Sequence, residues 1–375
     1  MKLKFSLLVF LFTITSGFSQ QYQLSPNAEI SVLTIGPGAS LNDAFGHNAF
    51  RVKDNDLGID AIYGYGQYDF DAPNFYLKFA QGKLEYLISK HNFADIYYHY
   101  TSYNRSIDEQ VLNFSAKEKQ NLFNYLENNY KPENRRYIYD FFYDNCATRI
   151  RDVTEKATST FRTLIHDHVG LNTWGSFGID IALGSVIDVE ATTSEHMFLP
   201  IYIHEFFANA KLDSSQKLVK DSSNLYEKKE DITSFDSLFS PLIIIGLLGL
   251  GILFITYKDY KNNKRTKWLD SIIFGTTGIV GIVLLLLWFA TDHSATAYNF
   301  NLLWAFPLNI LIVSQLLKPT IKNWVKRYIK FLIIMLALLT FHWISGIQVF
   351  AIGLIPLLIA IFIRFIFLSK YLNKN

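Results

Sequence analysis

The sequence predicts an α+β domain followed by an all-α membrane bundle of about five transmembrane helices. Three observations predict this organisation: a secretory signal at the start, strand and helix patterns in the first half, and repeated apolar runs in the last third. The composition agrees, because 50% of the 375 residues are hydrophobic and 18% are charged, a balance typical of a soluble domain joined to membrane spans. We expect a signal peptide over residues 1–20, an exported domain over 21–210, a linker over 211–239 and a transmembrane domain over 240–375.

The first twenty residues are arranged as a signal peptide. Lys2 and Lys4 precede the apolar run 5–12, and small and polar residues follow. This order predicts cleavage near Ser19 or Gln20, and the run is too short to span a bilayer. The alternative is an uncleaved anchor, and in both cases the rest of the chain leaves the cytoplasm.

Strand patterns fill the first part of the exported domain. Runs rich in β-branched and aromatic residues are bounded by glycine and proline turns. Residues 54–58 (DNDLG) have the chemistry of a hairpin loop. The predicted strands are 28–36, 47–52, 61–70 and 84–89, with further strand-like stretches within 96–114.

Two helices follow the strands. Ser115 opens the first with a capping box, because Glu118 lies three residues further on, and Lys131-Pro132 ends it. The second is predicted over 146–157, with apolar residues on one face. Strands first and helices afterwards indicate the α+β class. Residues 211–237 are polar and charged, which predicts a linker or an exposed helix.

Apolar runs of roughly membrane length dominate the chain after Ser240. The fourth run is short and can pair with the fifth as a tight hairpin around residues 345–348. The five predicted spans are 241–257, 272–290, 302–317, 331–343 and 349–368.

The loops between these runs differ in charge. Segments 258–267 and 318–330 each hold five Lys or Arg residues, whereas 291–301 and 345–348 hold none. The positive-inside rule therefore places both basic segments and Lys374 in the cytoplasm. A cleaved signal followed by five spans gives the same orientation. The net charge of +2 offers no argument for a nucleic-acid partner.

Cys146 is the one cysteine of the chain, so it cannot form an internal disulfide. It lies too far from the signal to be a lipidated N-terminal cysteine, and a buried structural thiol is the remaining alternative. Asp144 and Asn145 precede it as a helix cap. At a helix N-terminus the macrodipole is expected to lower the pKa of the thiol, and free N–H groups can hold an oxyanion. The position predicts a nucleophile.

A cysteine nucleophile needs a base, and His47 is the best-placed histidine. It follows Gly46 and begins a predicted strand, which fixes the imidazole and leaves room for a substrate. The alternative is a core histidine. We treat the other histidines of the domain as surface or core residues: His91, His99, His166, His168, His196 and His204.

Five sequence motifs together resemble the Lnb-type bacterial lipoprotein N-acyltransferases. The motifs are FGHNAFRV, YGYGQYDF, YLENNYKPENRRYIYDFFYDNCATRIRD from Tyr125, FLPIY, and TDHSATAYNFNLLWAFP, and the resemblance runs from about Ser31 to the last spans. It implies a multi-pass protein of the bacterial inner membrane with a periplasmic catalytic domain. It also implies a permuted papain-like fold, similar to NlpC proteins and lecithin:retinol acyltransferase, in which the histidine precedes the cysteine.

The resemblance implies a reaction in which Cys146 takes an acyl chain from a membrane phospholipid as a thioester. His47 would accept the thiol proton and assist the departing alcohol. The α-amine of the N-terminal lipidated cysteine of a diacylated lipoprotein would then attack the thioester and give a triacylated product. No metal, ATP or other cofactor is required.

A third polar group should orient His47. If residues 54–58 form the hairpin tip, His47 lies opposite about Gly66, and the nearest candidates are Tyr65, Gln67 and Tyr68. Asn145 is a further candidate, although an N-cap role explains it equally well.

Two pairs of charged or polar residues are candidates for contact with a lipid head group. Arg149 and Arg151 follow Cys146 on the same helix, where a solvated helix face is the alternative. Asp292 and His293 lie at the outer end of the second span, where an interfacial cap is the alternative.

Two other classes of function remain open. An NlpC-type cell-wall cysteine peptidase tethered to the membrane would use the same nucleophile, although it would not need five spans. A non-catalytic scaffold would keep Cys146 as a structural residue.

Overall fold

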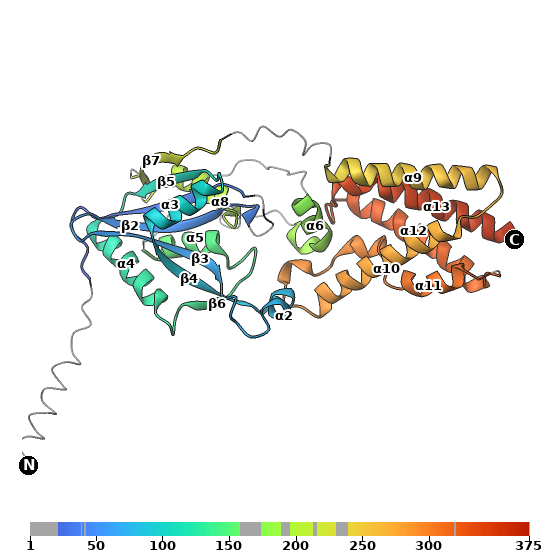
Figure 1. Cartoon of the computed structure of the whole chain (residues 1–375), viewed down its shortest axis with the longest axis horizontal. Coiled ribbons are helices and arrows are strands. Elements are labelled where there is room, and N and C mark those ends of the chain that lie inside the picture. Colours follow the sequence, from blue (N-terminus) through green and yellow to red (C-terminus); the bar gives the residue numbers. More distant parts are fainter. Residues whose placement is uncertain are drawn as a thin grey trace, which may run out of the picture.

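The computed structural model describes residues 22–38, 40, 43–157, 174–188, 196–212, 216–229, 239–318 and 320–374. Figure 1 shows a sheet domain joined to a helical bundle, with the C-terminus at the far end of the bundle. The predicted signal peptide over residues 1–20 lies outside the described residues, as do His166 and His168.

One antiparallel sheet of seven strands forms the frame of the N-terminal domain, in the order β6-β4-β3-β2-β1-β5-β7. The predicted hairpin joins β2 to β3, and its tip lies at the predicted place. The strands are β1 Glu29–Ile35, β2 His47–Asp54, β3 Ile59–Tyr68, β4 Glu85–Asn92, β5 Ile107–Leu112, β6 Arg136–Ile138 and β7 Val219–Tyr226.

Helices cover both faces of the sheet. Helices α4 Ala116–Tyr130, α5 Cys146–Ala157 and α8 Pro200–Asn209 bury leucine, isoleucine and phenylalanine side chains against one face. Helix α3 Phe93–Ser102 packs against the other. The predicted capping box of α4 is present, because the Ser115 hydroxyl accepts from the Glu118 amide and Glu118 accepts from the Ser115 amide. The α+β class is therefore confirmed.

Two segments differ from the prediction. Part of 96–114 is helix α3 and not strand, because Phe93, Ile96, Tyr97 and Tyr100 recur at helical spacing and pack together on the sheet. The segment predicted as a linker contains β7, which pairs with β5 as an edge strand. Most β7 side chains are exposed, so backbone pairing and not an apolar pattern makes it a strand.

The bundle consists of α9 Pro241–Lys261, α10 Lys267–Phe289, α11 Asn309–Leu316, α12 Asn323–Ile344 and α13 Ile355–Lys374. Within the described residues, four helices are long and apolar enough to cross a membrane, and α11 is not among them. The fourth predicted span is longer than expected, since α12 begins inside the basic segment 318–330. It packs against α13, as predicted.

The third predicted span is only partly helical. Pro307 interrupts it, leaving the short 3-10 helix η4 Phe300–Leu303 before the eight-residue α11. Gly278 and Gly281 of α10 let this irregular backbone approach closely, because a Cβ at Gly281 would lie 2.0 Å from the Ala305 carbonyl oxygen. The Asn309 side chain, which donates to Thr277 and accepts from Tyr328, supplies polar contacts beside the break.

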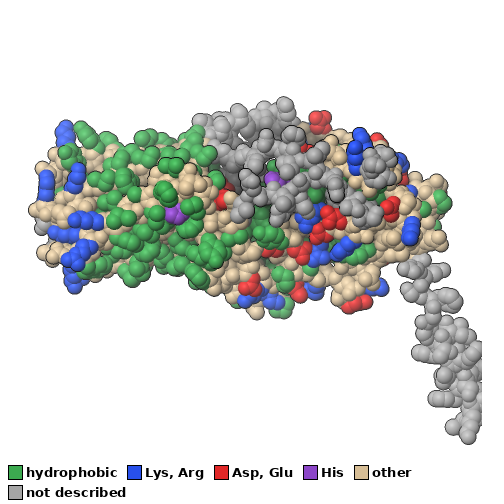
Figure 2. Space-filling view, turned by 180° about the vertical axis from the view of Figure 1, so that it is seen from behind, with side chains coloured by type: hydrophobic (Ala, Val, Ile, Leu, Met, Phe, Trp, Pro, Cys, Tyr) green, Lys and Arg blue, Asp and Glu red, His purple; other side chains and the backbone are tan. Residues whose placement is uncertain are grey.

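The bundle surface is strongly divided by residue type. Figure 2 shows apolar side chains along its length and Lys and Arg side chains gathered at the end away from the sheet domain. At this end Arg265 of the first basic segment donates to the carbonyl oxygen of Leu316, two residues before the second basic segment. The charge asymmetry on which the predicted orientation depends is therefore also an asymmetry in space.

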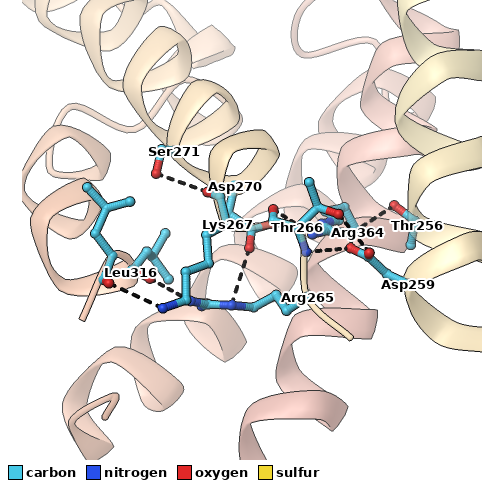
Figure 3. A network of polar contacts seen from close by, with 10 residues as sticks. Thr256, Asp259, Arg265, Thr266, Lys267, Asp270, Ser271, Leu316 and Arg364 are labelled. Carbon is cyan, nitrogen blue, oxygen red and sulfur yellow. Dashed lines mark hydrogen bonds and ion pairs between the residues drawn. The ribbon is translucent and has the colours of Figure 1, made fainter. Parts of the chain in front are cut away.

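A buried ion cluster joins three helices at the same end (Figure 3). Arg364 of α13 is fully buried and bonds to Asp259 of α9 and to Asp270 of α10, each at 2.7 Å. Asp259 also accepts from the backbone and side chain of Thr266, which precedes α10. A lone charge inside an apolar run is the sequence signal of such a cluster.

We expect Arg364→Met to lower the free energy of unfolding by about 3–5 kcal/mol, because it removes the buried cation that pairs with Asp259 and leaves Asp270 only the longer ion pair with Arg265, at 3.7 Å. The measurement is thermal unfolding of the full chain in detergent. Lys370→Met is the control, since Lys370 lies on the same helix and is exposed. Equal melting temperatures for the two variants would contradict a structural role of the cluster.

Candidate active site

A cavity of about 430 Å³ lies between the sheet domain and the loop that follows α10, and both Cys146 and His47 line it. The bundle contributes residues 292–295, and the sheet domain contributes the opposite wall. Most of the wall is aromatic or aliphatic. The aromatic lining residues are Phe45, Tyr65, Tyr68, Phe79, Tyr86, Tyr139, Phe141, Phe142 and Phe198.

Cys146 is the first residue of α5, as predicted, and Asn145 caps this helix. The Asn145 side-chain oxygen accepts from the Thr148 amide at 2.9 Å, and the Thr148 hydroxyl accepts from the Asn145 amide at 2.8 Å. The Asn145 side-chain nitrogen donates to the carbonyl oxygens of Phe141 and Phe198. Asn145 therefore fixes the start of the helix and both loops beside the thiol.

The environment of the thiol differs from the expected one. Burial raises the pKa of Cys146, although backbone N–H groups of Asn48, Ala147 and Cys146 and the charge of Arg105 act in the opposite direction. Burial is the larger effect, so the thiol is protonated at neutral pH. The N–H groups at the helix N-terminus stabilise the thiolate, but the protonated thiol remains the form present before reaction.

His47 begins β2 directly after a turn that requires glycine. Gly46 has a φ of 84°, and a Cβ there would lie 2.5 Å from the Ile35 carbonyl oxygen. His47 is partly buried, and burial together with the charge of Arg105 lowers its pKa from 6.5 to about 4. The imidazole is therefore neutral at physiological pH and free to accept a proton.

The His47 ring lies over β3 at Gly64. A Cβ at Gly64 would be 3.3 Å from His47 Nε2 and 3.3 Å from the Ser89 hydroxyl oxygen. The pairing of β2 with β3 ends at Ala49 and Gly64, before the irregularity of β3 between Tyr65 and Gln67, so the predicted place of His47 opposite Gly66 stays a prediction. The His47 ring lies beside Gly64. Because glycine has no side chain, the ring has room at this position.

We expect Gly64→Ala to slow alkylation of Cys146 by iodoacetamide several-fold at pH 7, because the new methyl group displaces the His47 ring. The measurement is the alkylation rate of the full chain in detergent. Gly178→Ala is the control, since a Cβ there meets no neighbour within 4 Å. An unchanged alkylation rate would show that the ring does not depend on this space.

The other candidates for the third group lie in different surroundings. Tyr65 lines the cavity, but its hydroxyl donates to Asn129 at 2.7 Å. Tyr68 lines the cavity within an aromatic cluster. Gln67 is exposed and is not among the described lining residues. Of the three candidates predicted from the register, Tyr65 and Tyr68 therefore line the cavity and Gln67 does not.

The two arginines on α5 lie outside the described cavity wall. Arg149 forms an ion pair with Asp144, and its guanidinium lies 4.3 Å from the centre of the Tyr137 ring. Arg151 pairs with Asp152 at 2.7 Å. These contacts favour the interpretation of both arginines as parts of the helix surface.

The loop after α10 does reach the site. Asp292 and His293 both line the cavity, and the Asp292 amide donates to the Gln81 carbonyl oxygen at 2.8 Å. The Ser294 hydroxyl donates to Asp140 at 2.7 Å, on the loop that leads to Cys146. The bundle is thus hydrogen-bonded to the loop that positions the thiol.

Arg105 was not predicted as a site residue. It is 5% exposed, donates to the Gly36 carbonyl oxygen at 2.8 Å and lies 4.8 Å from the centre of the Tyr100 ring. Its charge acts on both His47 and Cys146. Nothing in its local sequence marks it, because only the packing of the β1–β2 connection on the chain before β5 brings it close.

Comparison with known families gives two matches. Residues 16–176 match the family model of the Lnb N-terminal periplasmic domain, and residues 233–375 match that of the Lnb transmembrane domain. No curated protein and no solved structure shows a significant match to the chain. The two matched ranges contain His47, Cys146 and the loop after α10, whereas the cavity residues Ile179, Phe198, Leu199 and Pro200 lie between the ranges.

Proposed function

Because this chain belongs to the Lnb family, we propose that it transfers an acyl chain from a membrane phospholipid to the N-terminus of a lipoprotein. Cys146 carries the acyl chain as a thioester, and the acceptor is the α-amine of the lipidated cysteine of a diacylated lipoprotein. The observation that carries this proposal is the shared cavity, which brings a thiol, a neutral imidazole and an apolar wall together beside the membrane bundle.

The first half of the reaction makes the acyl-enzyme. Neutral His47 takes the proton from Cys146 as the sulfur attacks the ester carbonyl carbon of the phospholipid. Backbone N–H groups around the sulfur, including that of Ala147, are available to the developing oxyanion. The ester C–O bond breaks, and protonated His47 returns the proton to the glycerol oxygen, which leaves as lysophospholipid.

The second half makes the amide. The neutral α-amine of the acceptor attacks the thioester carbonyl carbon, and the C–S bond breaks. The proton lost by nitrogen passes through His47 to the sulfur, so the free thiol is restored. Replacing a thioester by an amide lowers the free energy, and the transfer needs no further reactant.

The aromatic wall suits an acyl chain. Phe45, Phe141 and Phe198 line the cavity, and Phe45 and Phe198 each pack edge-on against Phe141. Apolar walls with a few polar groups are typical of sites for largely apolar ligands. Water, the competing acceptor for the thioester, is disfavoured by the same surroundings.

The proposed reaction requires the sheet domain on the outer side of the inner membrane. Reporter fusions after Lys267 and after Lys330 should therefore report cytoplasm, and a fusion within residues 291–301 should report periplasm. The basic residues gathered at one end of the bundle are the physical reason. A periplasmic signal at Lys267 would place the cavity on the wrong side of the membrane.

The test of the function is incubation of membranes that contain the full chain with a phospholipid carrying a radiolabelled acyl chain. The proposal predicts label on the enzyme, in a bond cleaved by hydroxylamine, and then on the lipoprotein. Cleavage of murein peptides without labelling would indicate an NlpC-type peptidase. Neither labelling nor cleavage would indicate a scaffold, and either of these results overturns the proposal.

A further inference from the structure

A short helix beside the cavity exposes large apolar side chains. Helix α2, Phe75–Ala80, has no buried residue, and Tyr76 is 83% exposed. Phe70, Leu77 and Phe79 are also exposed. We call these residues, together with Phe75, the α2 patch. Exposed apolar residues gathered in this way mark an interaction surface more often than chance would give.

The α2 patch is continuous with the wall of the cavity. The ring of Phe75 packs against those of Phe70, Tyr76 and Phe79. The Tyr68 ring contacts the rings of Phe70, Phe75 and Phe79, and Tyr68 itself lines the cavity. Phe79 belongs to both the exposed patch and the cavity wall. An apolar path therefore leads from the surface of α2 to the chamber that holds Cys146.

The position of the α2 patch is fixed relative to the bundle. Gln81 directly follows α2, and its carbonyl oxygen accepts from the Asp292 amide at 2.8 Å. A Cβ at Gly82 would lie 3.1 Å from the His293 amide nitrogen, so the two loops are in close contact. Figure 1 shows α2 beside the end of α10 that faces the sheet domain.

This end of α10 has the features of a membrane boundary. The helix ends with Trp288 and Phe289, Phe289 is 72% exposed, and Tyr298 packs against Trp288. Aromatic residues of this kind are enriched where a membrane span meets the lipid head groups. Asp292 lies three residues beyond Phe289 and touches Gln81, so α2 is held at the depth of the head groups. Its one charged residue is Lys78, which suits phosphate groups.

We propose that the α2 patch inserts into the outer leaflet and delivers phospholipid acyl chains along Tyr68 and Phe79 to the cavity. This inference rests on the proposed function for the identity of the acyl chain as substrate. The insertion itself depends only on the contacts described above. An acyl chain that enters here need not leave the apolar phase before it reaches the thiol.

The test places a spin label at position 76 of the full chain in phospholipid vesicles. Cys146→Ala removes the one native cysteine, so Tyr76→Cys in that background carries a single nitroxide. Tyr98→Cys is the matched control, because Tyr98 lies on α3 of the same domain and is 75% exposed. The measurement is collision of each nitroxide with oxygen, which concentrates in lipid, and with a water-soluble nickel chelate.

We expect the label at position 76 to collide more with oxygen than with the nickel chelate, and the label at position 98 to show the reverse. Equal, water-like behaviour at both positions would overturn the inference. Shielding of position 76 from both reagents would also overturn it, because it would indicate contact with a second copy or another protein. None of these results requires catalysis, so they remain interpretable if the proposed transfer reaction fails its own test.

A kinetic readout separates delivery from insertion. In protein with Cys146 intact, Tyr76→Ser combined with Leu77→Ser should raise the KM for vesicle phospholipid several-fold, whereas Tyr98→Ser should not. Melting temperatures within a few degrees of wild type confirm folding of the variants, as expected for exposed positions. An unchanged KM together with an inserted label would overturn the delivery role.

Discussion

Cys146→Ala is expected to abolish both the acyl-enzyme and the acylated lipoprotein. The reaction proposed above has no route that avoids the sulfur, because the acyl chain leaves the phospholipid only as a thioester. Cys146→Ser should be almost as inactive, since the alcohol is a much weaker acid than the thiol and His47 is a weak base with its lowered pKa. The measurement is transfer of a radiolabelled acyl chain in membranes.

The control for this prediction is the amount and stability of the protein in the membrane. The thiol is only partly buried, so removing its sulfur should change the melting temperature little. Arg364→Met provides the opposite pattern, a loss of stability with the nucleophile intact. Acyl transfer by a stable Cys146→Ala protein would remove the thioester from the mechanism.

His47→Gln is expected to reduce acyl transfer by roughly a hundredfold or more, the usual contribution of a positioned general base. Glutamine keeps much of the shape of the imidazole but cannot carry the proton from the sulfur to the leaving oxygen. The acid limb of the wild-type pH–rate profile should lie near pH 4 and not near 6.5, because burial and Arg105 lower the pKa of His47 to about 4.

The same lowered pKa predicts how stability depends on pH. Between pH 6.5 and about 4, the unfolded chain binds a proton at His47 that the folded chain does not bind. The free energy of unfolding should therefore fall as the pH decreases through this window, and less steeply in His47→Gln. If His47→Gln aggregates at neutral pH while Cys146 alkylation keeps its pH dependence, His47 is structural and another group is the base.

The sequence predicts best where local patterns agree with long-range packing. The β1–β3 region, the capped helix α4 and the start of α5 at Cys146 follow from alternation, turn chemistry and caps. Helix α3 was missed because its tyrosines favour strands as single residues, although its apolar face has helical spacing. Strand β7 was missed because its partner β5 lies more than a hundred residues earlier in the chain.

The same distinction between local patterns and long-range packing applies to the residues of the site. Cys146 and His47 carry local signals, a helix cap and a glycine turn, and both line the cavity, so these two candidates could be selected from the sequence. Gly64 and Arg105 act through space on His47 and carry no signal of their own. The lowered pKa of His47 and the raised pKa of Cys146 depend on burial, which no local pattern reports.

The hydrogen bond between Ser294 and Asp140 joins parts of the chain that lie 154 residues apart. The cavity has one wall from each part, and neither part encloses it alone. The sheet domain and the bundle are therefore not interchangeable modules. In a chimaera built from two relatives, residues 79–82, 140–146 and 292–295 would have to come from the same parent, since each of these segments shapes the surface that the others meet.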